Sequence, residues 1–413
     1  MVLKSNRAAL WGLFSLLTLA PFNLPSTSHC NYTFYIDADF TTARSSSLSI
    51  KQGITTALGE VNHRLFNCIF NLVEKDHRAN PLQSRDNLHD YLDDPRVLLV
   101  YSGLHSPPLL SNKSFINENK ILYLVPWAAA GPITRSDSDE NWIFRLSIDD
   151  TKAGSFISKK AIAEGFRKPY LLLEDTGWGR SNHETMLMAL KQSKVGSSGI
   201  SWFKWGVSLE LAKQILEKII ASGADVIFFV GNAPEGETFI RAAAALGKAF
   251  NTPIRSHWGI TGGDFYNSET AEVINNLDLQ FIQTRFSFLS SVMTLSSLQI
   301  LNHAIKYNSS IRNAEDIATQ TGFVHAYDLT KILLAAIRQT GLTGNKQQDK
   351  AAIHYALENL YATPQGLLKS YYKPFSANTP TELDGHEALS ERDFAMGKYN
   401  SSGNIVLVDT KSR

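Results

Sequence analysis

Neither sign of charge dominates this chain of 413 residues, because 40 lysines and arginines face 39 aspartates and glutamates. The resulting net charge of +1 provides no field that would attract DNA, RNA or an acidic membrane surface, so we expect no nucleic-acid partner. Beyond the N-terminus, the sequence has no apolar run long enough to span a bilayer. A hydrophobic fraction of 43% is ample for folded cores, and the length indicates two or three domains.

Signatures of catalysis and of cofactor binding are also missing. The sequence has no G-x-S-x-G elbow, and its histidines lack the H-E-x-x-H spacing of a zinc hydrolase. Gly177-Trp178-Gly179 begins like a dinucleotide fingerprint, but Asn182 occupies the place of the third glycine, and the tryptophan would shield the backbone amides. Asp175 has no second carboxylate or nucleophile placed with it. We therefore expect no enzyme activity, no cofactor and no metal.

The N-terminus has the pattern of a secretory signal. Lys4 and Arg7 precede an apolar run over residues 8–20, which is too short to span a bilayer and fits an h-region. Small residues at 26–28 then suit a signal peptidase. We expect residues 1–28 to be a signal peptide and the mature protein to be periplasmic; the alternatives are a disordered N-terminus and an uncleaved anchor.

The two cysteines, Cys30 and Cys68, leave two questions open. A cysteine just after a signal sequence is typical of a lipoprotein, but the preceding Thr27, Ser28 and His29 match that pattern poorly, so lipidation at Cys30 is disfavoured. In an exported chain, the two cysteines form one disulfide or remain free thiols. The sequence does not decide between these two states.

The mature chain alternates between predicted strands and helices, in two successive series. Continuous apolar runs such as VLLVY and VIFFV are typical of parallel strands covered on both faces. Such alternation predicts two doubly wound α/β lobes. Strands are predicted over 32–38, 65–73, 97–101, 121–125, 170–173, 226–230 and 253–258, and helices over 49–62, 87–92, 186–190 after a capping box at 181–184, 209–220 and 234–249.

Loops that follow parallel strands are the places where such sheets bind ligands. Trp127, Trp178 and Trp258 all fall in these loops, although each tryptophan could instead pack within its own lobe. Aromatic walls with a few polar groups describe a small-molecule site, or a cation–π box for an ammonium group. The predicted mouth loops cover residues 102–106, 126–131, 174–179, 231–234 and 258–264.

Several segments, in this order and spacing, resemble the type I periplasmic substrate-binding proteins that serve branched-chain amino acid ABC transporters. The resemblance covers nearly the whole mature chain. The segments that carry it are IKQGITTALGEVN at 50–62, FRLSIDD at 144–150, EDTGWGR at 174–180, SGADV at 222–226, AYDL at 326–329, HEAL at 386–389 and GKY at 397–399.

The resemblance implies two α/β lobes that are joined by three crossovers and close on a ligand by hinge motion. Carried over to this chain, the first lobe comprises residues 31–148 and 286–390, and the second comprises 149–285 and 391–413. It also implies a protein that captures a small molecule and delivers it to a permease in the inner membrane. We expect the mature protein to be a monomer.

The resemblance further implies a set of ligand contacts. The family's serine-bearing loop falls on His105 and Ser106, and its carboxylate-binding loop falls on residues 127–130. The remaining family contacts fall on an aromatic turn residue, a second-lobe loop and an aromatic near the start of a late helix. The full set of implied contacts is His105, Ser106, Trp127, Ala128, Ala129, Ala130, Trp178, Asn232, Ala233 and Phe323.

Two positions depart from the family pattern. Ala129 replaces the threonine whose hydroxyl holds the ligand carboxylate, and Thr261 replaces the acid that holds the ammonium group. A buried ammonium without a carboxylate partner is costly. Either Asp264 reaches the ligand from the same loop, or the ligand is not a standard L-amino acid.

The hypothesis that follows is an exported solute-binding protein of an ABC importer, with an amino acid or a related carboxylate or aromatic compound as ligand. The alternative is a periplasmic sensor of the same fold that signals to a membrane receptor or regulator.

Overall fold

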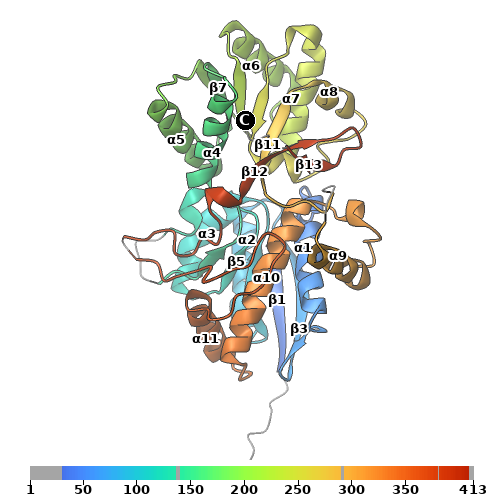
Figure 1. The fold of residues 1–413 in the computed structure, drawn as a ribbon. Helices are drawn as coiled ribbons and strands as arrows, with labels where there is room; N and C mark the ends of the chain where they lie inside the picture. The colour runs from blue at the N-terminus through green and yellow to red at the C-terminus, as the bar shows by residue number, and fades with distance from the viewer. Residues whose placement is uncertain (1–29, 136–139, 290–292, 380, 409–413) are drawn as a thin grey trace, which may run out of the picture.

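The computed structural model of the chain describes residues 30–135, 140–289, 293–379 and 381–408. They fold into two α/β lobes stacked end to end, as Figure 1 shows. The predicted signal peptide lies outside the described residues. Among the residues that are described, no helix combines the length and apolar character needed to cross a membrane.

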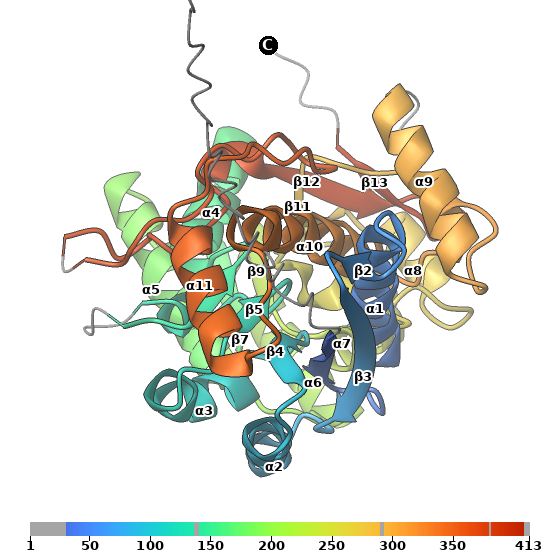
Figure 2. The same cartoon turned by 90° about the horizontal axis from the view of Figure 1, so that it is seen from below.

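The first lobe is built on a sheet in which every strand runs parallel to its neighbours except the short β2 at one edge. Helices α2 and α3 lie on one side of this sheet, and α10 and α11 lie on the other (Figure 2). In sheet order the strands are β2 (Arg64–Leu65), β3 (Cys68–Asp76), β1 (Cys30–Ala38), β4 (Val97–Ser102), β5 (Tyr123–Val125) and β6 (Ile143–Arg145). The helices are α1 (Arg44–Gly59), α2 (Pro81–Asp93), α3 (Ser106–Glu118), α9 (Leu295–Tyr307), α10 (Gln320–Thr340) and α11 (Lys346–Glu358).

The second lobe has a parallel sheet that ends in two antiparallel strands. Strands β7 and β9 are buried along their whole length, as their apolar sequences predict. In sheet order the strands are β13 (Ile405–Leu407), β12 (Phe394–Tyr399), β11 (Leu279–Thr284), β10 (Ile254–Ser256), β9 (Val226–Val230), β7 (Pro169–Glu174) and β8 (Gly199–Phe203). The helices are α4 (Asp150–Ala163), α5 (Gly177–Gln192), α6 (Leu209–Ala221), α7 (Ala233–Leu246) and α8 (Ala271–Asn276).

The chain crosses between the lobes after β6, after β11 and before β12, which confirms the predicted fold class. A buried ion pair ties the first crossover to the third. Arg145, the last residue of β6, places its Nη2 atom 2.6 Å from Oε1 of Glu387 and 3.0 Å from Oδ1 of Asp149. None of these three side chains is more than 1% exposed. Arg135 lies 2.6 Å from Asp149 and 3.9 Å from Glu387, so the two arginines together balance the two carboxylates and make their burial tolerable.

The start of α5 differs from the prediction. The helix begins at Gly177, so Gly177–Gly179 form its first turn rather than a separate loop, and the predicted capping box at 181–184 lies inside the helix. Thr176 is the residue that caps it, because its hydroxyl accepts the N–H of Gly179. A side chain at Gly179 would collide with the carbonyl of Glu174, so glycine is what lets the helix start directly against the end of β7.

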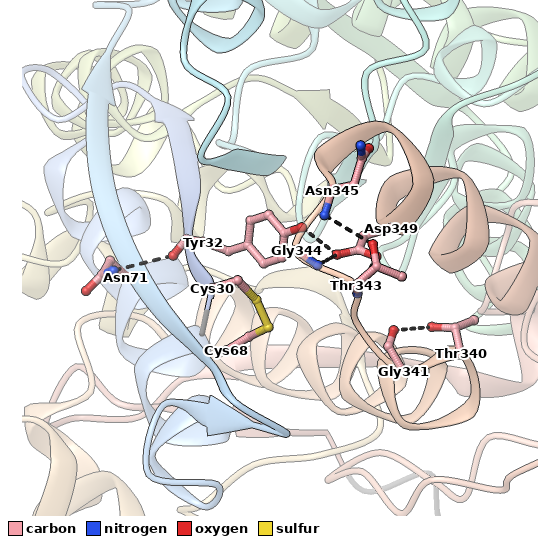
Figure 3. The surroundings of a disulfide bond; sticks show 10 residues. All are labelled: Cys30, Tyr32, Cys68, Asn71, Thr340, Gly341, Thr343, Gly344, Asn345 and Asp349. Atoms are coloured by element: carbon pink, nitrogen blue, oxygen red, sulfur yellow. Dashed lines mark hydrogen bonds between the residues drawn. A yellow bond between two sulfur atoms is a disulfide. The ribbon is translucent and has the colours of Figure 1, made fainter. Parts of the chain in front are cut away.

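Cys30 and Cys68 form a disulfide that joins the starts of β1 and β3, as Figure 3 shows. Beside it, the hydroxyl of Tyr32 donates to Oδ2 of Asp349, and the backbone N–H of Thr343 donates to Oδ1 of Asp349 at 2.8 Å. These bonds tie the first turn of α11 to β1. The structure therefore answers the open question of the thiols in favour of the disulfide.

Candidate functional site

Five loops from the two lobes meet around a small cavity, and they are the five loops that the sequence singles out as mouth loops. The space at their centre is about 10 Å³, which is close to the least that holds one water molecule. The first lobe contributes Leu104, His105, Ser106, Pro107, Trp127 and Ala129, and the second contributes Glu174, Trp178, Asn232, Trp258 and Gly259.

A larger chamber of about 410 Å³ adjoins this cavity, because Leu104, His105 and Asn232 line both spaces. We call the two spaces together the cleft. The chamber opens between the start of α1 and the start of α7, and Trp205 and Phe265 provide aromatic surface there. A space of this size is in the range of small-molecule sites.

Tryptophans form the walls of the inner cavity. The rings of Trp127 and Trp258 come from opposite lobes, and their centroids are 6.0 Å apart. Trp178 meets the ring of His257 edge-on at 5.0 Å. Any side chain at Gly259 would collide with Trp178, so this glycine lets the second-lobe loops close around the indole. Among the described residues, nothing accepts the buried indole N–H of Trp127 or of Trp178.

Glu174 places a buried carboxylate at the cavity, with 1% of its surface exposed. Oε2 accepts from the side-chain amide of Asn232 at 3.0 Å, and Oε1 accepts from the hydroxyl of Thr176 at 3.0 Å. The pKa of Glu174 is raised to about 7, chiefly by burial and in part by the charge of Glu235, against the lowering effect of hydrogen bonds from Trp205, Thr176 and Asn232. No lysine or arginine in the described part of the chain forms an ion pair with it.

The lining of the chamber is acidic. Glu235, Glu237 and Asp264 all face it, and burial raises the pKa of Glu235 above its usual range. Neither the cavity nor the chamber has a lysine or an arginine in its lining, and His105 is the one basic side chain there among the described residues. The cleft therefore favours positive charge in whatever it binds.

His105 is held by a carboxylate on its own lobe. Its Nε2 atom lies 3.2 Å from Oδ2 of Asp39, whose Oδ1 accepts the backbone N–H groups of Thr41 and Thr42. Although burial alone would raise it, hydrogen bonds from His105 and Thr42 hold the pKa of Asp39 well below its usual range. The other ring nitrogen, Nδ1 of His105, is buried without a partner in the described residues. The contact with Asp39 thus fixes the imidazole in place, while its Nδ1 atom has no hydrogen-bond partner in the described residues.

Of the residues that the family resemblance implies, six line the inner cavity: His105, Ser106, Trp127, Ala129, Trp178 and Asn232. Ala233 and Asp264 lie one layer out, in the lining of the chamber. The side chain of Asp264 is exposed, and its nearest polar partner is the hydroxyl of Ser45 at 3.4 Å, across the cleft.

The other four implied residues lie elsewhere. Ala128 and Ala130 are fully buried, and their carbonyls accept from Nη1 of Arg145, so they hold the loop rather than line the space. Thr261 donates its hydroxyl to the carbonyl of Trp258 at 2.7 Å. Phe323 is 0% exposed and packs against Phe288 and Tyr327 in the core of the first lobe.

Several residues that line the cleft were not among the predicted contacts, and Glu174 and Trp205 are the two that add most to its chemistry. The signal for Glu174 was present, because it is the last residue of an otherwise apolar strand and so stands at the edge where ligands bind. Trp205 follows β8, in a turn that carries no recognisable pattern. Its ring lies 5.3 Å from that of His105 on the facing lobe, so it closes one side of the cleft.

Comparison with known proteins agrees with this geometry. The family model described as periplasmic binding protein matches residues 38–263, which is more than half of the chain. A search of curated proteins found no match.

Solved structures with the same fold cover nearly the whole chain. A solute-binding protein of an ABC transporter from R. palustris, in complex with 4-hydroxybenzoate, is 17% identical with a TM-score of 0.72, over 92% of this chain and 96% of that one. The branched-chain amino acid transporter substrate binding protein LivJ from Streptococcus pneumoniae, in complex with isoleucine, is 16% identical with a TM-score of 0.71, over 92% and 99%. A type 1 periplasmic binding protein from Bordetella pertussis is 15% identical with a TM-score of 0.73, over 92% and 100%. On the extent of the family match, this chain belongs to the periplasmic binding protein family.

Proposed function

We propose that this protein is the exported solute-binding component of an ABC importer, and that it captures a small amino acid or amino-acid-like molecule carrying an ammonium group. The observation that carries the ligand class is the carboxylate of Glu174, buried at the cavity between the lobes without a cationic partner in the described residues. Burial without a cationic partner disfavours the ionised carboxylate and so raises its pKa. A bound ammonium group would offset this free-energy cost of ionisation.

The lining around Glu174 supports the same ligand class. Glu235, Glu237 and Asp264 line the adjoining chamber, and no lysine or arginine in the described part of the chain lines either space. A lone anion would meet repulsion here, whereas an ammonium group would meet carboxylates and the face of an indole. In this account Glu174 takes the place of the family's acid, whose position Thr261 occupies without facing the cavity.

Unused donors at the cavity suit an acceptor on the ligand. The indole N–H groups of Trp127 and Trp178 are buried and have no acceptor among the described residues. The hydroxyl of Ser106 accepts from the backbone N–H of Ala130 at 3.2 Å, which leaves its own proton free to donate. A ligand carboxylate would satisfy such donors. Ammonium and carboxylate together describe an amino acid, and isoleucine is the ligand named for one of the structural relatives.

The family and the architecture support delivery to a permease. The walls of the cleft come from both lobes, so a ligand held there bridges them and stabilises their closed arrangement. A membrane permease that recognises the closed pair then distinguishes the loaded protein from the free one. The predicted signal peptide over residues 1–28 would place the protein in the periplasm for this task.

The test is calorimetric titration of the purified protein with a panel of amino acids, amines and carboxylates, using wild type, Glu174→Gln and Glu237→Gln. We expect at least one ligand with an ammonium group to bind, and we expect Glu174→Gln to lower the affinity for that ligand by more than tenfold. Glu237→Gln removes a more exposed carboxylate from the same cleft and should lower the affinity for the ligand by less than threefold. Binding of carboxylates that lack an amine, unaffected by Glu174→Gln, would contradict the proposed ligand class.

The affinity should also depend on pH in a defined direction. The ligand needs the ionised form of Glu174, whose pKa of about 7 is set by burial and by its neighbour Glu235. Protonation below pH 7 should therefore weaken binding by up to about tenfold per pH unit in wild type. The Glu174→Gln protein should lack this dependence.

A further inference from the structure

A group of metal-ligating side chains lies in the first lobe, outside the cleft. His354 and Glu358 are one helical turn apart at the end of α11, and His386 approaches them from the segment that precedes the third crossover. One ligand atom from each of these side chains lies within 4.8 Å of the others. We propose that His354, Glu358 and His386 form a binding site for a divalent transition-metal ion of the zinc class.

The distances fit such an ion. Nε2 of His386 is 3.1 Å from Oε1 of Glu358, and Nε2 of His354 is 3.9 Å from the same oxygen. Bonds of about 2.0–2.2 Å in tetrahedral geometry place neighbouring ligand atoms roughly 3.4 Å apart. An ion held by all three side chains therefore requires His354 to leave its hydrogen bond with the carbonyl of Asn141 and to move toward Glu358. Two imidazoles and one carboxylate are a set of ligands that zinc takes in proteins, with water at the fourth position.

His386 is already oriented for this role. Its Nδ1–H donates to the carbonyl of Ile143 at 2.9 Å, which directs Nε2 toward Glu358. The ring stacks on Phe144 at 3.9 Å, and the backbone carbonyl of His386 accepts from the N–H of Arg145. A backbone carbonyl that fixes the tautomer of a histidine ligand is the usual outer partner at metal sites.

His354 and Glu358 provide the route of entry. Their side chains are 15% and 12% exposed, so solvent reaches them, whereas His386 is fully buried behind them. The Nε2–H of His354 donates to the carbonyl of Asn141 at 2.7 Å. An ion bound at this nitrogen replaces the proton, which moves to Nδ1 of the same ring. The ring must also turn away from the carbonyl of Asn141, because an ion about 2.0–2.2 Å from Nε2 along that hydrogen bond would overlap the oxygen. The proton shared between His386 and Glu358 is released to solvent, so the exchange is balanced.

An ion at this site would join two segments that are far apart in the sequence. It would link the last turn of α11 to His386, whose neighbour Glu387 pairs with the buried Arg145. We expect the metal to stabilise the folded first lobe, because the three ligands are brought together only by folding.

The experiment is titration of the tag-free, chelator-treated protein with Zn²⁺, followed by calorimetry and thermal unfolding, with Co²⁺ as a spectroscopic probe. We expect one high-affinity ion per chain, a higher Tm, and cobalt absorption of a tetrahedral site. His354→Gln, at the more exposed position, should weaken Zn²⁺ binding at least tenfold while the protein stays folded. His386→Gln should do the same, and its circular dichroism spectrum checks that this buried change leaves the fold intact.

The matched control is His303→Gln. His303 also faces a glutamate, with Nδ1 3.2 Å from Oε1 of Glu60, but it belongs to no such cluster. Its replacement should leave Zn²⁺ affinity unchanged. The proposal is overturned if wild type binds no ion at micromolar concentrations, or if His354→Gln and His303→Gln bind equally well. Glu174→Gln should retain the ion, which separates this test from the proposed ligand site.

Discussion

Replacing Glu174 with glutamine should stabilise the free protein at neutral pH. The pKa of this carboxyl is about 7 in the folded chain, against a usual value of 4.5. Between pH 4.5 and about pH 7, the carboxyl is ionised in the unfolded chain but still protonated in the folded chain. The free energy of unfolding therefore falls as the pH rises through this interval. Below pH 4.5 the carboxyl is protonated in both the folded and the unfolded chain, so its burial costs no stability. Above pH 7 the loss has reached its full size.

The magnitude follows from the size of the shift. A pKa that rises from 4.5 to about 7, at about 1.4 kcal/mol for each pKa unit, corresponds to about 3–4 kcal/mol. Glutamine keeps the shape of the side chain but does not ionise, so the variant lacks this loss. Its own hydrogen bonds with Thr176 and Asn232 add an offset that does not depend on pH. The difference in unfolding free energy between Glu174→Gln and wild type should therefore grow by about 3 kcal/mol from pH 4 to pH 8.

The assay is urea unfolding at pH 4, 6 and 8, followed by tryptophan fluorescence and circular dichroism, with ligand removed. Glu237→Gln serves as the control for the loss of one negative charge. A pH-dependent difference below about 0.5 kcal/mol would refute the reasoning, because Glu174 would then be ionised at no cost in the folded protein. The expected result would show that this residue destabilises the fold while it serves the site, which is common for functional groups.

Three further changes have expected outcomes. Trp178→Ala should weaken ligand binding by about 1–3 kcal/mol in calorimetry, since it removes an aromatic wall of the cavity. Glu387→Ala should lower the unfolding free energy by about 3 kcal/mol, because it leaves the buried guanidinium of Arg145 short of a partner. Replacing both Cys30 and Cys68 with serine should cost up to about 4 kcal/mol, the chain-entropy value for two cysteines 38 residues apart.

For each of the three variants, a defined result would contradict the prediction. Unchanged affinity of a folded Trp178→Ala protein would assign the ring to core packing alone. For Glu387→Ala the comparison is Glu391→Ala, which breaks an exposed pair with Lys159 and should cost less than about 1 kcal/mol. Equal losses in the two variants would contradict the burial argument. A serine double variant as stable as the oxidised wild type would show that the disulfide does not constrain the unfolded chain.

The sequence predicted the fold well because its strongest signals are local. Continuous apolar runs such as those of β4, β7 and β9 mark buried parallel strands without reference to the rest of the chain. Once these strands are placed, the loops after them must share one edge of each sheet. The five loops that line the cavity were identified in this way.

Individual contacts were harder to predict, since they depend on how far each loop extends. Phe323 is in the core because α10 starts three residues before it and directs the ring inward. Ala128 and Ala130 are turned away from the space by their bonds to Arg145, a residue whose burial no local pattern reveals. The sequence pattern predicts a loop that begins at Glu174, whereas this residue ends β7 and faces the cleft because the strand continues one residue further.

The measurement that tests the central claim most directly is native mass spectrometry of the protein isolated from its own periplasm, followed by denaturation and identification of any released molecule. We expect a small compound with an ammonium group, bound one per chain and lost in Glu174→Gln. A released carboxylate or aromatic acid without an amine, retained by Glu174→Gln, would contradict it.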